Sequence, residues 1–372
     1  MQGQKIPATV ITGFLGAGKT TMIRNLLTEA GGRKIALIVN EFGDLGVDGD
    51  VLKGCGAENC TEDDIVELTN GCICCTVADD FIPTMEKLLD RDDKPDHIVI
   101  ETSGLALPQP LVAAFNWPDI KTRVTVDGVI TVVDSAAVAE GRFAHDHDRV
   151  DAQRQADEAL DHESPLEELF EDQLTAADLI VLNKADLIDA EGLEAVRTNV
   201  SERARRSPAM VTSRQGQVSP KVLLGLGMES ENDIINRKSQ HEMEHEAAHA
   251  AENDDHHHDH HHEHDHHHHD HDHDEFGSFV VEAGDVADPS AFVEALKVII
   301  ADHDILRLKG FAHVPGKPMR LVIQAVGGRI DSYYDRAWTA AETPGTKLVV
   351  IGLHDIDQVT ITDAITKVST QG

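Results

Sequence analysis

Residues 13–20 read Gly-Phe-Leu-Gly-Ala-Gly-Lys-Thr, and this octapeptide decides the fold of the first half of the chain. It matches the phosphate-loop pattern G-x-x-x-x-G-K-[ST] and has the required context. Apolar residues 8–12 precede it, and a helix-like segment at residues 21–30 follows it. Glycines let consecutive backbone N–H groups turn toward a phosphate, and the N-terminus of the next helix favours negative charge. The octapeptide therefore predicts a P-loop NTPase domain.

Several residues of this stretch are candidate ligands of a nucleoside triphosphate and its Mg²⁺ ion. The Lys19 ammonium can neutralise charge on the β- and γ-phosphates, and the Thr20 hydroxyl can bind Mg²⁺. We therefore expect both residues to be catalytic. The candidate cofactor-binding residues here are Gly13, Gly16, Ala17, Gly18, Lys19, Thr20 and Thr21.

A second part of the phosphate site is expected after the apolar strand at residues 97–101, which ends in Glu101. An acidic residue in this place can hold Mg²⁺ through water, so we count Glu101 among the catalytic residues. A carboxylate that is simply exposed to solvent is the alternative. Gly104 follows, and its backbone N–H can contact the γ-phosphate. Because no residue stands out as an activator of the attacking water, we expect slow hydrolysis.

Residues 183–186, Asn-Lys-Ala-Asp, follow the apolar run at residues 179–182 and predict which base is bound. The Asp186 carboxylate can accept hydrogen bonds from the ring N–H and the exocyclic amine of guanine, a donor pair that adenine lacks. The tetrapeptide is a weak signal alone. After a P-loop it favours GTP over ATP, with Asn183, Lys184 and Asp186 as the guanine-binding residues.

A Cys-x-Cys-Cys motif, formed by Cys72, Cys74 and Cys75, predicts a site for a transition metal. Three thiols so close together can bind one ion, and the N-terminus of the helix-like segment that follows would favour their thiolate forms. Three ligands leave a tetrahedral site open, and water, Glu41 or a group from a partner can complete it. An open site suits metal transfer better than a structural role. Zn²⁺ and Co²⁺ both accept such ligands, so metal identity stays open.

Other candidate ligands have two interpretations each. Cys55 and Cys60 are either extra ligands or incidental loop thiols, and Glu41, in a candidate switch segment at residues 40–44, is either a ligand or an ordinary loop charge. Between residues 256 and 273, thirteen of eighteen residues are His and the other five are Asp or Glu. This tract can hold several metal ions weakly, or it can be a solubilising linker.

Charge and cysteine usage restrict the partners and the compartment. With 32 Lys and Arg against 67 Asp and Glu, the net charge of −35 disfavours nucleic acid and anionic membranes as partners. All five cysteines fall between residues 55 and 75, which fits a metal site in a reducing compartment better than disulfides. Without a recognisable secretory signal or a long apolar run, we expect a cytoplasmic protein. The sequence leaves the oligomeric state open.

The hydrophobic pattern divides the chain into three zones. Residues 1–216 alternate short apolar runs with helical patterns, which predicts an α/β domain with a mostly parallel sheet. Residues 217–276 lack apolar periodicity, so we expect a disordered acidic, His-rich linker. Residues 277–372 predict a small α+β domain whose sheet is covered on one face by two helices. The expected strands are residues 8–12, 34–40, 97–101, 128–134, 179–183, 209–213, 278–282, 305–313, 319–326 and 347–353, and the expected C-terminal helices are residues 289–301 and the tail from 357.

Together these motifs resemble those of the CobW family of P-loop GTPases. The resemblance covers nearly the whole chain, from the P-loop, through Asn-Glu-Phe-Gly at residues 40–43 and the Cys-x-Cys-Cys motif, to the tetrapeptides at residues 101–104 and 183–186, the His-rich linker and the C-terminal domain. Within the family, the segments at residues 55–60 and 142–174 are similar to those of the subgroup associated with cobalamin biosynthesis.

The resemblance implies a GTPase that acts as a metal chaperone, with Cys72, Cys74 and Cys75 binding the cargo. It favours Co²⁺ as that cargo, with Zn²⁺ or Ni²⁺ as alternatives. A metal-acceptor protein is the implied partner, and a cobaltochelatase is one candidate. A metal-storage protein is the alternative from another class. Glu101 stands where many GTPases carry Asp, which leaves its role at Mg²⁺ less defined.

Overall fold

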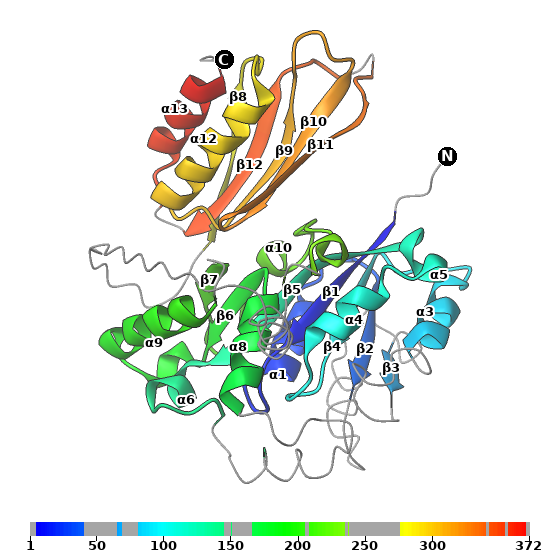
Figure 1. Ribbon diagram of the computed structural model, residues 1–372, viewed down its shortest axis with the longest axis vertical. Coiled ribbons are helices and arrows are strands. Elements are labelled where there is room, and N and C mark those ends of the chain that lie inside the picture. The colour runs from blue at the N-terminus through cyan, green and yellow to red at the C-terminus, as the bar shows by residue number, and fades with distance from the viewer. Residues whose placement is uncertain are drawn as a thin grey trace, which may run out of the picture.

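The computed structural model of the protein describes residues 5–40, 65–68, 81–144, 150, 166–204, 208–234, 237, 276–339, 342–353 and 356–369, which form two domains (Figure 1). The first domain is built on a seven-stranded sheet in which all neighbouring strands are parallel, as predicted for its α/β class. Its strands, in sheet order, are β3 (Ile65–Leu68), β2 (Ile35–Asn40), β4 (His97–Glu101), β1 (Ile6–Thr12), β5 (Val124–Asp134), β6 (Leu179–Asn183) and β7 (Ala209–Thr212).

Helices cover both faces of this sheet, because its strands are apolar on both sides. Alternate residues of β4 belong to two hydrophobic clusters, one with α1 (Lys19–Thr28) and the other with α3 (Ile82–Leu89) and α4 (Pro108–Ala114). β4 itself is buried along its whole length. The remaining elements of this domain are α5 (Pro118–Lys121), α6 (Ser135–Ala139), α8 (Leu166–Ala176), α9 (Ala190–Arg203), α10 (Pro220–Leu223) and the 3-10 turns η3 (Ala185–Leu187) and η4 (Ser230–Asn232).

The sheet of the C-terminal domain is antiparallel. Two helices cover one of its faces, as predicted (Figure 1). The helices α12 (Pro289–Asp302) and α13 (Gln358–Ser369) share one hydrophobic cluster with the sheet. The carboxylate of Asp288 begins α12 by accepting the N–H groups of Ser290 and Ala291. The strands, in sheet order, are β11 (Arg329–Ala337), β10 (Met319–Val326), β9 (Arg307–Ala312), β12 (Thr346–Leu353) and β8 (Phe276–Ala283).

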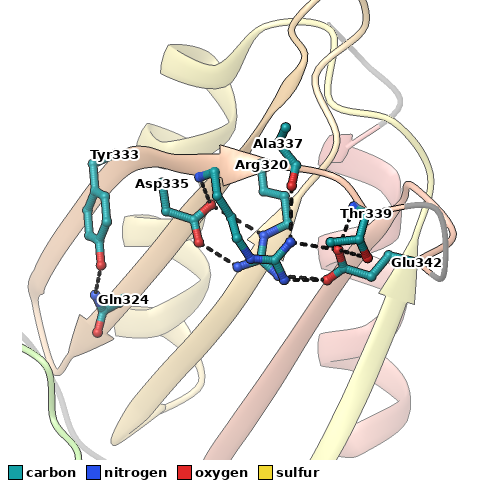
Figure 2. Close-up of polar contacts among 8 residues, drawn as sticks. Arg320, Gln324, Tyr333, Asp335, Ala337, Thr339 and Glu342 are labelled. Atoms are coloured by element: carbon teal, nitrogen blue, oxygen red, sulfur yellow. Dashed lines mark hydrogen bonds and ion pairs between the residues drawn. The ribbon is translucent and has the colours of Figure 1, made fainter. Parts of the chain in front are cut away.

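Ion pairs hold β11 and the loop that follows it against β10 (Figure 2). Arg320 of β10 donates a hydrogen bond of 3.0 Å to Glu342 and also pairs with Asp335 of β11. Glu342 accepts two further bonds from Arg336, at 2.6 and 2.7 Å, and these hold the pKa of the Glu342 carboxyl well below its ordinary value. These charged contacts explain how a strand with little apolar content is kept in the sheet.

The C-terminal domain rests on the amino ends of the strands of the first sheet (Figure 1). Arg329, the first residue of β11, donates a hydrogen bond of 2.8 Å to Asp178, which immediately precedes β6. An apolar contact accompanies this bond, because three residues of the C-terminal domain join the hydrophobic cluster that contains α1. They are Leu306, Val326 and Ile351.

Asp178 is the centre of a buried ion cluster at this junction. Its carboxylate accepts hydrogen bonds from Arg237 at 2.5 Å, Arg329 at 2.8 Å and the Ser230 hydroxyl at 2.5 Å. Burial alone would raise the pKa of Asp178, but the two guanidinium groups outweigh burial and lower it. A cavity of about 810 Å³ lies beside this cluster. The cavity is therefore at the amino edge of the sheet, whereas the P-loop lies at the carboxyl edge.

The structure departs from the prediction in three places. Strands β3 and β11 were not expected. Residues 217–234, which we assigned to the disordered linker, instead form α10 and η4 and contribute buried apolar side chains to the first domain. The rest of the expected linker, apart from residue 237, lies outside the described residues until β8 begins. In the part of the chain that the structure describes, no helix has the length and apolar character needed to cross a membrane.

Candidate nucleotide and metal site

The loop between β1 and α1 has the backbone shape of a phosphate-binding loop. Gly13, Gly16 and Gly18 have positive φ angles of 134°, 77° and 102°. A Cβ atom on Gly13 would lie 2.2 Å from the carbonyl oxygen of Val132, and one on Gly18 would lie 2.3 Å from the Asn183 side-chain nitrogen. Glycine is therefore required at both positions, and the loop keeps the close approach that lets its N–H groups surround a phosphate.

Lys19 begins α1, and its side chain turns back over the loop. The ammonium donates hydrogen bonds to the carbonyl oxygens of Gly13, at 2.7 Å, and Phe14, at 3.3 Å. The residue is only 6% exposed, so its positive charge lies against the loop and is shielded from solvent. A buried ammonium in this position fits the negative charge of a phosphate chain. Ala17 is buried, and Thr21 is half-buried in the first turn of the helix.

Thr20 and Glu101 join the loop to the neighbouring strand. The Thr20 hydroxyl donates a hydrogen bond of 2.9 Å to the carboxylate of Glu101, the last residue of β4. Glu101 is 4% exposed, which excludes the alternative of a carboxylate that simply faces solvent. Hydroxyl and carboxylate oxygens are ligands that Mg²⁺ prefers, so this pair fits the expected ion.

The chain after Glu101 passes directly over the P-loop. The backbone N–H of Thr102 donates a hydrogen bond of 3.0 Å to the carbonyl of Ile11, which lies near the end of β1. A Cβ atom on Gly104 would lie 2.6 Å from the backbone nitrogen of Leu15, so residue 104 touches the loop itself. The structure thus brings the two predicted parts of the phosphate site together.

Asn183 and Lys184, at the end of β6, contact three neighbouring segments. The Asn183 amide donates to the carbonyl of Ala17 at 2.8 Å and accepts from the N–H of Gly216 at 3.0 Å. Lys184 has a positive φ of 60°, and its ammonium lies 2.5 Å from the carboxylate of Asp134, at the end of β5. These bonds fix the tetrapeptide against the P-loop.

Asp186, the remaining guanine candidate, is exposed in η3, where a base can reach its carboxylate from solvent. Asp134, Gln173 and Gly216 also shape the site and were not predicted. Asp134 ends an apolar strand as Glu101 does, and that repeated pattern was the available signal. Gln173 and Gly216 act through contacts between distant segments, for which the sequence has no local signal.

The predicted ligands of the transition metal lie outside the described residues, but the strands that lead to them are described. Asn40, at the end of β2, pairs with Leu68, at the end of β3, and Val39 pairs with Glu101. The chain therefore enters both ligand-bearing segments at the edge where Glu101 lies. The positions without a structural description are Glu41, Cys55, Cys60, Cys72, Cys74, Cys75 and the tract at residues 256–273.

Comparison with known proteins finds a matching family model for each of the two domains. The family model described as CobW/HypB/UreG, nucleotide-binding domain, matches residues 7–212, and the cobalamin synthesis protein cobW C-terminal domain matches residues 276–368. The chain is 71% identical over 362 residues to a zinc chaperone CobW of Sinorhizobium sp., with 97% of each chain covered. It is 50% identical over 365 residues to a zinc chaperone CobW of Pseudomonas aeruginosa, covering 97% of this chain and 91% of that one.

A solved structure, the Zn(II)-bound YjiA GTPase from E. coli, aligns over 98% of this chain and 99% of its own, with 23% identity and a TM-score of 0.38. The first family model spans the P-loop, the Thr20–Glu101 pair and Asn183, and the second spans the antiparallel domain. The chain therefore belongs to the CobW/HypB/UreG family of P-loop GTPases, a family of metallochaperones.

Proposed function

We propose that the protein binds a transition metal at Cys72, Cys74 and Cys75 when Mg²⁺-GTP is bound, and that it releases the metal to an acceptor protein after hydrolysis. In this proposal the loop from Gly13 to Thr21 and the N–H of Gly104 hold the phosphates. Asn183, Lys184 and Asp186 hold guanine, and Glu41 is a candidate fourth ligand of the metal. The cytoplasm remains the proposed compartment.

The register of β2, β3 and β4 is the observation that supports this coupling most directly. Val39 pairs with Glu101, and Asn40 pairs with Leu68, so the three strands end side by side. Glu41 directly follows β2, and Cys72 comes four residues after β3, a span of at most about 14 Å for an extended chain. A movement of the backbone around the bound phosphates could therefore reach the proposed metal ligands through only a few residues of chain.

In this proposal each residue of the phosphate site has a separate role in GTP hydrolysis. Bound Mg²⁺ would neutralise charge that builds up on the phosphates. The Thr20 hydroxyl and the Glu101 carboxylate would hold that ion, and Lys19 would neutralise the β- and γ-phosphates from the loop side. In this proposal these residues accelerate hydrolysis only by positioning the phosphates and neutralising their charge. The intrinsic hydrolysis rate should therefore be low until an acceptor or a metal completes the site.

Zinc is the cargo that we propose, with cobalt as the second candidate. Sulfur-rich tetrahedral sites accept either metal. The resemblance to the cobalamin subgroup favoured cobalt, whereas two relatives at 71% and 50% identity bear the name zinc chaperone. A cobaltochelatase is a reasonable acceptor only if the cargo is cobalt, so the identity of the metal also decides the class of partner.

Measuring metal affinity with and without Mg²⁺ and a non-hydrolysable GTP analogue tests the proposal. Linkage requires that a nucleotide which tightens metal binding is itself bound more tightly by the same factor when metal is present. We expect this reciprocal gain for the preferred metal, and a competition between Zn²⁺ and Co²⁺ identifies it. Equal metal affinity in the two nucleotide states would refute the coupling.

Variants of the chain separate a chaperone from a metal store. Cys74→Ser should abolish the tight, nucleotide-dependent site. Cys60→Ser, outside the motif, decides between the two interpretations of that thiol, because only the loss of a ligand would weaken metal binding. Deleting residues 256–273 should lower only the number of weakly bound ions. A store would behave in the opposite way, losing most of its capacity with the tract and little with Cys74.

A further inference from the structure

Gln173 is a wholly buried amide that reaches the segment following β4. It lies in α8, and its side-chain nitrogen donates hydrogen bonds to the carbonyl oxygens of Gly104, at 3.2 Å, and Ala106, at 3.1 Å. Two carbonyl acceptors identify this end of the amide as the nitrogen. The Gln173 backbone carbonyl accepts a bond of 2.8 Å from the hydroxyl of Thr131 in β5, which ties the helix to the sheet.

The segment that Gln173 holds lies between α8 and the P-loop. Gly104 touches the backbone of Leu15 so closely that a Cβ would approach to 2.6 Å. On its other side, the Gly104 carbonyl is bound by Gln173. The residue is thus fixed from both sides, and a shift of its backbone N–H requires a change in the bonds to Gln173.

The chemistry of the side chain suits this task better than that of similar residues. An amide nitrogen carries two N–H donors, which match the two carbonyl acceptors. Glutamate in its charged form would place an acceptor against both carbonyls, and an apolar residue of the same length would leave both without this donor. A buried carbonyl that loses its partner is costly, so the segment would move to find another.

We propose that Gln173 is a positioning residue for the γ-phosphate: it holds Gly104 where the backbone N–H meets that phosphate, and so helps the protein distinguish GTP from GDP. This inference rests on the proposed contact between Gly104 and the γ-phosphate. Gln173 itself touches no nucleotide. Its effect should therefore fall on the ligand that carries a γ-phosphate and leave the diphosphate almost unaffected.

Affinities of the full-length protein for a non-hydrolysable GTP analogue and for GDP, both with Mg²⁺, test the proposal in Gln173→Met. We expect about tenfold weaker binding of the analogue and a change within about twofold for GDP, the size expected for loss of the paired hydrogen bonds. Gln109→Met is the matched control, because the Gln109 amide also donates to α8, but at the Asp172 carbonyl, 3.1 Å away. It should change neither affinity.

Two results would overturn the inference: an equal loss for both nucleotides, which indicates a general structural role, or no loss for either. Hydrogen exchange in the wild-type protein gives a second test that needs no variant. Protection of residues 102–107 should rise with the GTP analogue and not with GDP, and equal protection would contradict the proposal. If the metal affinity of the wild type does not respond to the nucleotides, the proposed function fails, and the analogue and GDP affinities of Gln173→Met still decide the role of Gln173.

Discussion

The hydroxyl of Thr20 donates a hydrogen bond of 2.9 Å to the carboxylate of Glu101, and this contact joins the first turn of α1 to the last residue of β4. In the proposed function, both oxygens would hold Mg²⁺. Thr20→Ala should therefore lower kcat for GTP hydrolysis at least about tenfold, or about 1.4 kcal/mol of activation free energy. Phosphate release measured over a range of Mg²⁺ concentrations should show a higher Mg²⁺ requirement.

Thr28 provides the control for that experiment, because it is a threonine at the other end of the same helix. Its hydroxyl donates to the carbonyl of Arg24 within α1, at 2.9 Å on the surface. Thr28→Ala should leave the Mg²⁺ dependence unchanged. The assignment of Thr20 is wrong if the two variants respond to Mg²⁺ in the same way.

The exposed carboxylate of Asp186 should determine the choice of base. Asp186→Asn replaces an acceptor of the guanine N–H groups by an amide, which can donate to the additional carbonyl of xanthine. Affinity for GTP should fall at least about tenfold, as expected for bonds to a charged group, while affinity for XTP should rise. Asp189→Asn, which alters the residue that caps α9 through the N–H of Gly192, should not change the preference. Unchanged GTP affinity in Asp186→Asn would rule out this role.

Asp178→Asn should destabilise the junction between the domains strongly. The substitution removes the buried charged partner of Arg237, which is 1% exposed and keeps the partly buried Asp233 carboxylate 3.2 Å away. Loss of one partner from a buried ion pair costs about 3–5 kcal/mol, and the remaining contact with Asp233 places the expected loss toward the lower end. Urea unfolding should reveal either a large shift or two separate transitions. Glu282→Gln removes an exposed pair with Lys347 and should cost less than about 1 kcal/mol. Similar losses in the two variants would contradict the central role of Asp178.

His97 should make stability depend on pH below neutrality. Its ring lies 2.8 Å from the Thr9 hydroxyl, and burial lowers the pKa of His97 although Asp127 attracts the charged form. The unfolded histidine binds a proton near pH 6.5, whereas the folded one stays neutral to lower pH. The free energy of unfolding should therefore be constant above about pH 7 and decrease as the pH falls toward the folded pKa, by at most about 1.4 kcal/mol per pH unit from this group.

A comparison of the wild type with His97→Gln isolates this contribution, because the glutamine amide can still bond to Thr9 but does not titrate. Urea midpoints at pH 8, 7, 6 and 5 should converge or cross as the pH decreases, since only the wild type loses the histidine contribution. Parallel curves across this range would show that the protonation of His97 is not linked to folding.

Where the sequence predicted the fold well, the signal was local. The bounds of β4 and β6 agree with the prediction because each is an apolar run closed by one polar residue. β11 was missed because none of its residues is buried and four of the nine are charged, and ion pairs such as Arg320–Asp335 replace the apolar pattern. Residues 217–234 were misassigned because the apolar side chains that they contribute to the core are not regularly spaced, so neither helical nor strand periodicity appears.

In the candidate site, too, only residues with a local sequence signal were predictable. The glycines, Lys19 and Thr20 were predictable because the P-loop is one continuous segment whose backbone geometry the sequence itself specifies. The contacts of Gln173 with Gly104 and of Asn183 with Gly216 join segments 69 and 33 residues apart. Nothing near those residues in the sequence reports on a partner that only the folded sheet brings close.

The C-terminal domain is attached at the amino ends of the strands, whereas the nucleotide site lies at their carboxyl ends. The residues at one edge of the first sheet can therefore change without direct contact with those at the other. Asp178 and Asn183 mark the opposite ends of β6, about five residues or roughly 17 Å apart. A substitution that reshapes one edge leaves the residues of the other untouched. Chimeras that exchange the C-terminal domain while keeping Arg329 and the apolar residues Leu306, Val326 and Ile351 should thus retain the GTP hydrolysis rate of the first domain.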